Sequence, residues 1–138
     1  MIEKIKQLLQ EMKFNPPATE IDLRNVEKEI GMSFPPQYKE FMLESNGAEG
    51  SVGDNSYLAI WSVEEIVPLN EAGGVEQFTP GLVYFASDGG GTAYAFDKRT
   101  ENVSIVETPD DSIDIEEAEL CGNTFMEFLQ YLYDYNME

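Results

Sequence analysis

The sequence predicts one α+β domain over residues 1–138, in which helices near both ends of the chain cover an antiparallel or mixed sheet with a central hairpin or meander. Two observations predict this class. Apolar residues recur at helical spacing near both ends, whereas strand-forming segments fill the middle. The connections between those segments are too short for crossover helices, so neighbouring strands must pair antiparallel. With 42% apolar residues, the chain can bury a core without disulfides.

Three helices are expected before residue 48. Within residues 1–14, apolar residues at helical spacing predict an extra N-terminal helix over residues 2–13, and the prolines of "NPPA" end it. Thr19 can cap a second helix that Gly31 closes. The segment "SFPPQYKEFMLESNG" (33–47) predicts a third, short helix, because prolines stand near its start and a glycine follows its last turn.

The character of the sequence changes after Gly47. Residues 48–56 are expected to form a flexible turn or loop, and residues 62–74 a short helical turn followed by a loop. Composition predicts strands at 57–61, 82–86, 92–96 and 103–107. Residues 108–120 read as an acidic connector with helical tendency near its end. Thr124 and Glu127 have the spacing of a capping box, which predicts a final helix after Thr124.

The glycine stretch "SDGGGTAYAFD" (87–97) has two interpretations. A phosphate-binding loop needs a helix after the glycines, but "TAYAFD" alternates at the strand period. The loop contains no Lys, Arg or His, and Asp88 would repel an anion. We therefore favour a tight hairpin, in which a structural turn joins two strands and is formed by Asp88, Gly89, Gly90 and Gly91.

Acidic residues dominate the charge of the chain. Eight Lys and Arg stand against 27 Asp and Glu, which gives a formal net charge of −19. The excess is concentrated in the second half, where no basic residue follows Arg99. Such a surface repels nucleic acid and anionic membranes, so neither is expected as a partner, and it attracts basic proteins or cations. The alternative is that the acidity serves solubility alone.

The residue inventory argues against an enzyme. The sequence has no histidine, which removes Ser-His-Asp and Cys-His catalysis and histidine metal ligation. Cys121 therefore has neither an activating histidine nor a second cysteine with which to share a metal. "DDSIDIEE" (110–117) resembles a calcium loop, but Ile115 takes the place of the required glycine. We expect no catalytic residue, metal or cofactor, and a pair of buried carboxylates is the enzymatic alternative that stays open.

Two kinds of side chain are candidates for contacting a partner protein. Carboxylates late in the chain supply negative charge: Asp110, Asp111, Asp114, Glu116, Glu117 and Glu119. Trp61, the single tryptophan, either belongs to the core or its rim or anchors an interface. The C-terminal tyrosines alternate around a helix, so at least one of them, such as Tyr133, is expected to face solvent.

Four short blocks resemble the SUKH superfamily, the cell-wall-assembly-regulator-like proteins. They are "FPPQYKEFMLESNG", "LN" at Leu69–Asn70, "FASDGGGTAYAFD" and "TFMEFL", and they occur in the family's order within residues 19–135. Thr92 departs from the pattern, because many relatives are expected to carry Asp or Glu there. The resemblance implies architectural roles for the block residues: Pro36, Tyr38 and Phe41 would seat a helix, Asn46–Gly47 would end it, and Asp88 to Gly91 would form the hairpin turn.

Proteins of this superfamily are best known as bacterial immunity proteins against polymorphic toxins. The resemblance therefore implies a non-enzymatic protein that binds and neutralises a cognate toxin domain, and the acidic surface favours a basic nuclease as that toxin. The alternative is a regulatory or scaffold module that binds a protein without inhibiting a toxin. The first residues carry charges throughout and no apolar run is long enough to span a bilayer, so a soluble, cytoplasmic protein is expected.

Overall fold

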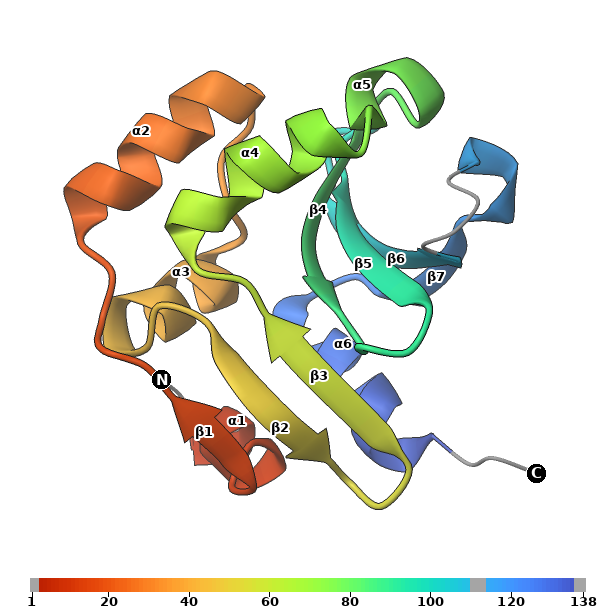
Figure 1. The fold of residues 1–138 in the computed structure, drawn as a ribbon. Helices are drawn as coiled ribbons and strands as arrows, with labels where there is room; N and C mark the ends of the chain where they lie inside the picture. The colour runs from red at the N-terminus through yellow and green to blue at the C-terminus, as the bar shows by residue number, and fades with distance from the viewer. Residues whose placement is uncertain (1–2, 110–113, 136–138) are drawn as a thin grey trace.

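The computed structural model describes residues 3–109 and 114–135. Its helices are α1 (Glu3–Leu8), α2 (Glu20–Ile30), α3 (Pro36–Glu44), α4 (Val63–Ala72), α5 (Val75–Phe78), the 3₁₀-helix η1 (Ile115–Glu117) and α6 (Phe125–Asp134). Its strands are β1 (Met12–Phe14), β2 (Ala48–Val52), β3 (Ser56–Ile60), β4 (Leu82–Ser87), β5 (Thr92–Asp97), β6 (Ser104–Pro109) and β7 (Glu119–Gly122). Within the described residues, the strands form one antiparallel meander in chain order (Figure 1). The α+β prediction is confirmed, with the antiparallel form of the sheet.

The meander is weakest between β3 and β4. These strands share two register pairs, Ala59 with Ser87 and Ile60 with Ala86. One further bond follows, from the Trp61 N–H to the Phe85 carbonyl oxygen at 3.0 Å. In Figure 1, β1–β3 and β4–β7 accordingly form two differently oriented parts of one sheet. Beyond Trp61 the chain leaves the sheet and forms α4, which packs against α2 and β4.

The main core lies between one face of the sheet and the helices α1, α2, α3, α4 and α6. Aromatic rings occupy its centre, where Tyr38 contacts four phenylalanines at ring-centroid distances of 4.9–5.7 Å. The buried Tyr38 hydroxyl has no hydrogen-bond partner among the described residues, and burial raises its pKa. The tyrosine of the "FPPQYKEF" block therefore contributes its ring to packing rather than its hydroxyl to chemistry.

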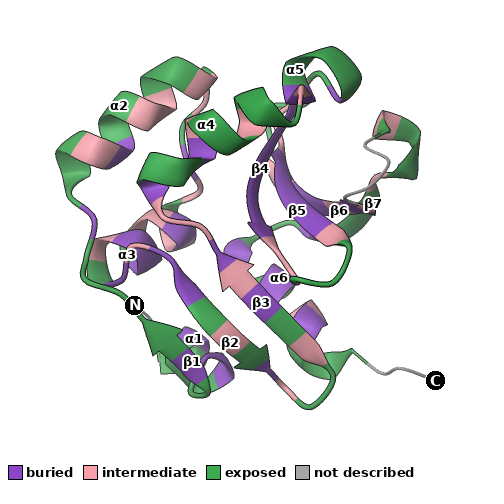
Figure 2. Cartoon of the chain, in the orientation of Figure 1, coloured by how far each residue is buried: buried purple, intermediate pink, exposed green. Residues whose placement is uncertain are grey.

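A second, smaller buried cluster lies on the opposite face of β4–β6. We call it the second cluster, and it consists of Val75, Leu82, Tyr84, Ala93, Ala95 and Val106. Partly exposed side chains before α4 and around η1 pack against it, namely Trp61, Ile115 and Ala118. Figure 2 shows β4 and β5 largely buried, whereas much of the outer surface of α2 and α4 is exposed. Both faces of the central strands are thus covered.

The last three residues of the "FPPQYKEFMLESNG" block, Ser45–Gly47, connect the end of α3 to β3 and α4. Gly47 has a φ of 84°, and a Cβ there would lie 2.5 Å from the Ile60 carbonyl oxygen, so only glycine fits without rearrangement. The Asn46 Oδ1 accepts a hydrogen bond from the Val63 N–H at 2.8 Å, at the first residue of α4. These two residues therefore hold the end of α3 against β3 and the start of α4.

The structure corrects several predicted elements. Residues 12–14 do not continue the first helix but form β1, in which Met12 pairs with Gly50. The predicted loop at 48–56 contains β2, whose first three residues pair with both β1 and β3. The predicted short turn after residue 62 is a ten-residue helix that continues through Pro68. Strand β7 lies where only an acidic connector was expected.

The missed strands have one physical reason. Short strands form because a neighbouring strand satisfies their backbone groups, and local composition carries little sign of that partner. The helix α4 is longer than predicted because Val63 and Ile66 are buried in the main core. The remaining predicted helices and strands are confirmed, with small differences at their ends.

Candidate functional site

The predicted acidic residues surround η1, between β6 and β7. Asp114, Glu116, Glu117 and Glu119 are all exposed, and none forms a salt bridge with another described residue. Asp114 begins the turn, because its Oδ1 accepts a hydrogen bond from the Glu116 N–H at 3.0 Å. Asp110 and Asp111 lie outside the described residues. The four described carboxylates therefore form an acidic surface that has no basic partner there.

Trp61 lies directly after β3 and is half-buried. It packs against the second cluster, and so do Ile115 and Ala118 of the η1 region. The fold therefore brings Trp61 and η1, which are distant in the sequence, to one hydrophobic cluster. We call the set Trp61, Asp114, Glu116, Glu117 and Glu119 the Trp61–η1 surface. Ile115 and Ala118 pack against the cluster while the neighbouring Glu116 and Glu117 are exposed. Glu119 pairs with Glu107 on β6, so it borders this surface from the α6 side of the sheet. A partly exposed aromatic side chain near exposed carboxylates has the composition of an interface anchor with a charged rim.

Tyr133 lies on a different side of the molecule. Its side chain is 41% exposed, in agreement with the predicted exposure. It belongs to α6, whose buried residues pack into the main core on the other face of the sheet. The structure therefore does not bring Tyr133 to the Trp61–η1 surface, and it leaves this tyrosine as a separate exposed aromatic group.

The glycine stretch forms a hairpin turn between β4 and β5. The Asp88 Oδ1 accepts hydrogen bonds from the N–H groups of Gly90 at 2.8 Å and Thr92 at 3.0 Å. Gly89 and Gly91 have φ values of 74° and 123°, which favour glycine. The strands on both sides pair antiparallel, so the hairpin prediction is confirmed. Asp88 closes the turn through its own side chain.

A polar cluster on the α6 side of the sheet was missed by sequence reasoning. Glu107 on β6 accepts hydrogen bonds from the Tyr131 hydroxyl at 2.6 Å and from the Cys121 thiol at 3.4 Å. Burial, followed by the charge of Glu107, raises the pKa of Cys121. A thiol that keeps its proton is a poor nucleophile, so the geometry favours a structural role for Cys121. The signal in the sequence was Glu107 itself, a carboxylate directly after the apolar pair Ile105–Val106 of a predicted strand.

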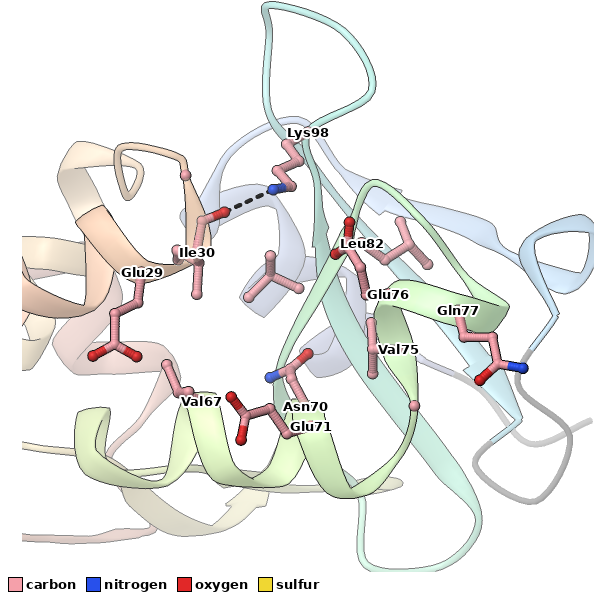
Figure 3. Close-up of a pocket in the computed structure, with 13 residues that line it drawn as sticks. Glu29, Ile30, Val67, Asn70, Glu71, Val75, Glu76, Gln77, Leu82 and Lys98 are labelled. Carbon is pink, nitrogen blue, oxygen red and sulfur yellow. Dashed lines mark hydrogen bonds between the residues drawn. The ribbon is translucent and has the colours of Figure 1, made fainter.

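A cleft of about 610 Å³ opens between the end of α2, the helices α4 and α5, and strand β4 (Figure 3). We call it the α2–α4 cleft. Its lining combines aliphatic side chains with three carboxylates and one lysine. The Lys98 Nζ donates a hydrogen bond to the Ile30 carbonyl oxygen at 2.7 Å, at the end of α2. Because the lining residues come from separate segments of the chain, no local pattern in the sequence indicated this cleft.

Two further findings concern the part of the chain that the structure describes. No group of three or more histidine, cysteine, aspartate or glutamate residues is placed to hold a metal ion. No helix combines the length and the apolar character that crossing a membrane requires. The arrangement of exposed carboxylates, a half-buried tryptophan and an apolar cleft is suited to binding another protein.

Comparisons with known proteins identify relatives of the chain. The model of the SMI1 / KNR4 family (SUKH-1) matches residues 17–131, from the segment before α2 to α6. The chain is also similar to a protein of Bacillus subtilis (strain 168) called "Uncharacterized protein YnaB", with 37% identity over 70 residues. The aligned stretch covers 51% of this chain and 44% of that protein, so the match spans less than half of the relative's length.

Proposed function

Because the chain belongs to the SMI1/KNR4 family (SUKH-1), we propose that it is a bacterial immunity protein that acts in the cytoplasm without catalysis. It binds the toxic domain of a cognate polymorphic toxin and neutralises it. The toxin domain is a basic nuclease, and the Trp61–η1 surface covers the face with which that nuclease holds nucleic acid. Carboxylates of the immunity protein then take the places of nucleic-acid phosphates.

The packing of Trp61 and of Ile115 and Ala118 from the η1 region against one cluster supports this proposal. Four exposed carboxylates that form no salt bridge with another described residue attract a basic face and accelerate the encounter of the two proteins. Trp61 supplies apolar area that a bound partner can bury. The net charge of −19 adds an attraction that extends beyond the contact area.

The side-chain chemistry supports a role without catalysis. The chain has no histidine, so the common general base is missing. The raised pKa of Cys121 keeps its sulfur in the weakly nucleophilic thiol form. Glu107 accepts hydrogen bonds from two neighbouring side chains and serves as their common acceptor.

Co-expression tests the function directly. The proposal predicts that a neighbouring gene encodes a large secreted protein, whose C-terminal domain is the toxin candidate. If the proposal is correct, that domain stops bacterial growth by itself, and co-expression of this chain restores growth and yields a complex in a pull-down. Restored growth without a complex in the pull-down would contradict neutralisation by binding. A complex with a host protein and no restored growth would support the regulatory or scaffold alternative.

The Trp61–η1 surface is tested by removing its charges. We expect Asp114→Asn, Glu116→Gln, Glu117→Gln and Glu119→Gln together to weaken toxin binding by about 10- to 100-fold at about 0.1 M salt, because the attraction to the basic face is lost. Trp61→Ala should weaken binding by about tenfold or more through lost buried area. Titration calorimetry at several salt concentrations measures both effects, and wild-type affinity should fall steeply as salt rises.

A matched control removes the same number of charges elsewhere. Its substitutions are Glu3→Gln, Glu11→Gln, Glu40→Gln and Asp54→Asn, all at exposed positions outside the Trp61–η1 surface and the α2–α4 cleft. The control should weaken binding by less than about threefold, since only the long-range attraction is reduced. Equal losses of affinity in the two sets of variants would contradict electrostatic masking by this surface. So would an affinity that does not change with salt concentration.

A further inference from the structure

The α2–α4 cleft is a concave candidate binding site next to the second cluster. Its volume of about 610 Å³ lies within the range of sites that enclose a ligand or a group of side chains. Its apolar lining consists of five aliphatic side chains. Ile30 and Val67 are half-buried, and Val75, Leu82 and Val83 are buried. Such a lining favours an aliphatic or aromatic side chain over a charged one.

The amide of Asn70 does not make this lining polar. Its Nδ2 donates to the carbonyl oxygens of Ile66 at 2.6 Å and Tyr84 at 2.9 Å. Its Oδ1 accepts from the Tyr84 N–H at 2.8 Å. Because both ends of the amide are engaged by the protein backbone, Asn70 needs no hydrogen bond from a bound molecule. The same bonds hold α4 at a constant distance from β4, which keeps the cleft open in advance of binding.

Carboxylates from three elements surround the cleft. Figure 3 shows Glu29 of α2, Glu71 of α4 and Glu76 of α5 around the apolar side chains. All three are exposed, and none forms a salt bridge with another described residue. Lys98 is the basic residue of the lining, and its Nζ is already bound to the end of α2. Three acidic residues against one basic residue leave a charge of −2 on the lining.

We propose that the α2–α4 cleft receives a loop of the partner protein in which an apolar side chain is flanked by arginine or lysine. The apolar side chain enters between Val67, Val75 and Leu82. The flanking cations pair with Glu29, Glu71 and Glu76. An acidic loop is rejected by the carboxylates, and a loop without an apolar residue leaves the lining unfilled, so both features are needed for binding.

This inference rests on the proposed function in one respect, that the chain binds a basic protein. It adds a second contact for the same partner. Val75 and Leu82 line the cleft and also belong to the second cluster, against which Trp61 and Ile115 pack. The cleft and the Trp61–η1 surface therefore share one continuous cluster.

Short peptides test the cleft without knowledge of the partner. The probe is the peptide acetyl-RLLR-amide, and the controls are acetyl-ELLE-amide, which reverses the charge, and acetyl-RGGR-amide, which removes the apolar side chains. Backbone amide chemical shifts of the full chain locate each peptide. We expect acetyl-RLLR-amide to shift the amides of Val67, Val75 and Gln77, whereas neither control peptide shifts them.

A pair of variants separates the cleft from general attraction. Glu71→Lys should weaken binding of acetyl-RLLR-amide by about tenfold, because a cation replaces a carboxylate beside the bound arginine. Glu40→Lys changes the net charge equally at an exposed position on α3, outside the cleft, and should weaken it by less than about twofold. Val67→Trp, which fills the cleft, should abolish the shifts, and circular dichroism of all variants confirms that they fold. Shifts spread over the whole acidic surface, or equal losses in the two lysine variants, would overturn the inference.

The inference and the proposed function fail separately. If the peptide does not bind the cleft while loss of the η1 carboxylates still weakens toxin binding, the cleft proposal is wrong and the immunity proposal stands. If the peptide binds the cleft but co-expression neutralises no toxin, the immunity proposal is wrong and the cleft remains a site for another basic protein.

Discussion

Glu107 holds a negative charge between two side chains that would themselves become negative at high pH. Its Oε1 accepts hydrogen bonds from the Tyr131 hydroxyl and the Cys121 thiol. The bond to Glu107, followed by burial, raises the pKa of Tyr131, and burial followed by Glu107 raises that of Cys121. Burial, with the charges of Asp88 and Glu107, raises the pKa of Tyr94 in the same way. All three groups therefore keep their protons in the folded protein at pH values where the unfolded chain releases them.

These raised pKa values predict that the free energy of unfolding falls at alkaline pH. The stabilisation is complete below the ordinary pKa values and is lost as pH rises above them, because the unfolded chain then binds fewer protons than the folded one. Between about pH 8 and about pH 11, the urea midpoint of the wild type should fall. Tyr131→Phe should be less stable by about 1–2 kcal/mol near neutral pH, since Glu107 loses a hydrogen bond, but its midpoint should fall less steeply.

Tyr133→Phe is the control for this titration, because it removes an exposed hydroxyl from the same helix. Its midpoint should follow the wild-type curve. Parallel curves for Tyr131→Phe and the wild type would show that Tyr131 does not contribute to the alkaline loss of stability.

Asn70 connects two elements where the sheet lacks a strand. Because β3 pairs with only the last residues of β4, the backbone of Tyr84 has no strand partner on that side. The side chain of Asn70 takes the place of a strand, since it donates to the Tyr84 carbonyl oxygen and accepts from the Tyr84 N–H. Tyr84 is only 3% exposed, so water cannot readily replace these bonds. The "LN" block therefore has a structural explanation in the packing of α4 on β4.

Replacing Asn70 should be costly for stability. Asn70→Ala leaves a buried N–H and a buried C=O without partners, so we expect a loss of about 2–3 kcal/mol in the free energy of unfolding. Asn70→Asp keeps an acceptor for the N–H but places a carboxylate oxygen against the Tyr84 carbonyl, and it should also destabilise the protein. Urea denaturation followed by circular dichroism measures both changes.

Asn55→Ala is the matched control for Asn70. Asn55 is exposed and donates one hydrogen bond to the Tyr135 carbonyl oxygen at 3.1 Å. Its replacement should cost less than about 0.5 kcal/mol. Comparable losses for Asn55→Ala and Asn70→Ala would contradict the assigned role of the Asn70 amide.

Repulsion between like charges acts on the molecule as a whole. A net charge of −19 is distributed over a chain of 138 residues. Among the described residues, salt bridges join Arg24 to Glu20, Lys39 to Glu27 and Arg99 to Asp97. Most of the described carboxylates therefore form no salt bridge with a described basic residue, and repulsion between them destabilises the compact state. The same charge that attracts a basic partner thus lowers the free energy of unfolding of the free protein.

Salt should accordingly stabilise the isolated protein. Raising sodium chloride from about 0.01 M to about 0.5 M screens the repulsion, so the urea midpoint should increase. A variant that carries Glu3→Lys, Glu40→Lys and Asp54→Lys has a lower net negative charge, and its midpoint should increase less over the same range. A midpoint that does not respond to salt, or responds equally in both proteins, would contradict a destabilising role for the net charge.

Local signals in the sequence were sufficient for much of the fold. The cap at Thr19 and the glycine at Gly31 mark the ends of α2, and both have the predicted backbone geometry. Thr124 likewise caps α6, where its Oγ1 accepts from the Glu127 N–H at 3.1 Å. Half of the predicted capping box is formed, because the Glu127 side chain accepts from Asn123 instead. The turn at Asp88 was predictable for the same reason, since its bonds join residues that are close in the chain.

The sequence by itself determined α2, α3, α6 and the central strands, the hairpin turn, the excess of negative charge and the absence of histidine, because each depends on residue type or short-range spacing. Tertiary structure alone decided which surfaces exist. It added β1, β2 and β7 at sites of strand pairing, joined Asn70 to Tyr84, placed Trp61 on the same cluster as η1, and formed the α2–α4 cleft. These features depend on contacts between residues far apart in the chain, for which local periodicity carries no information.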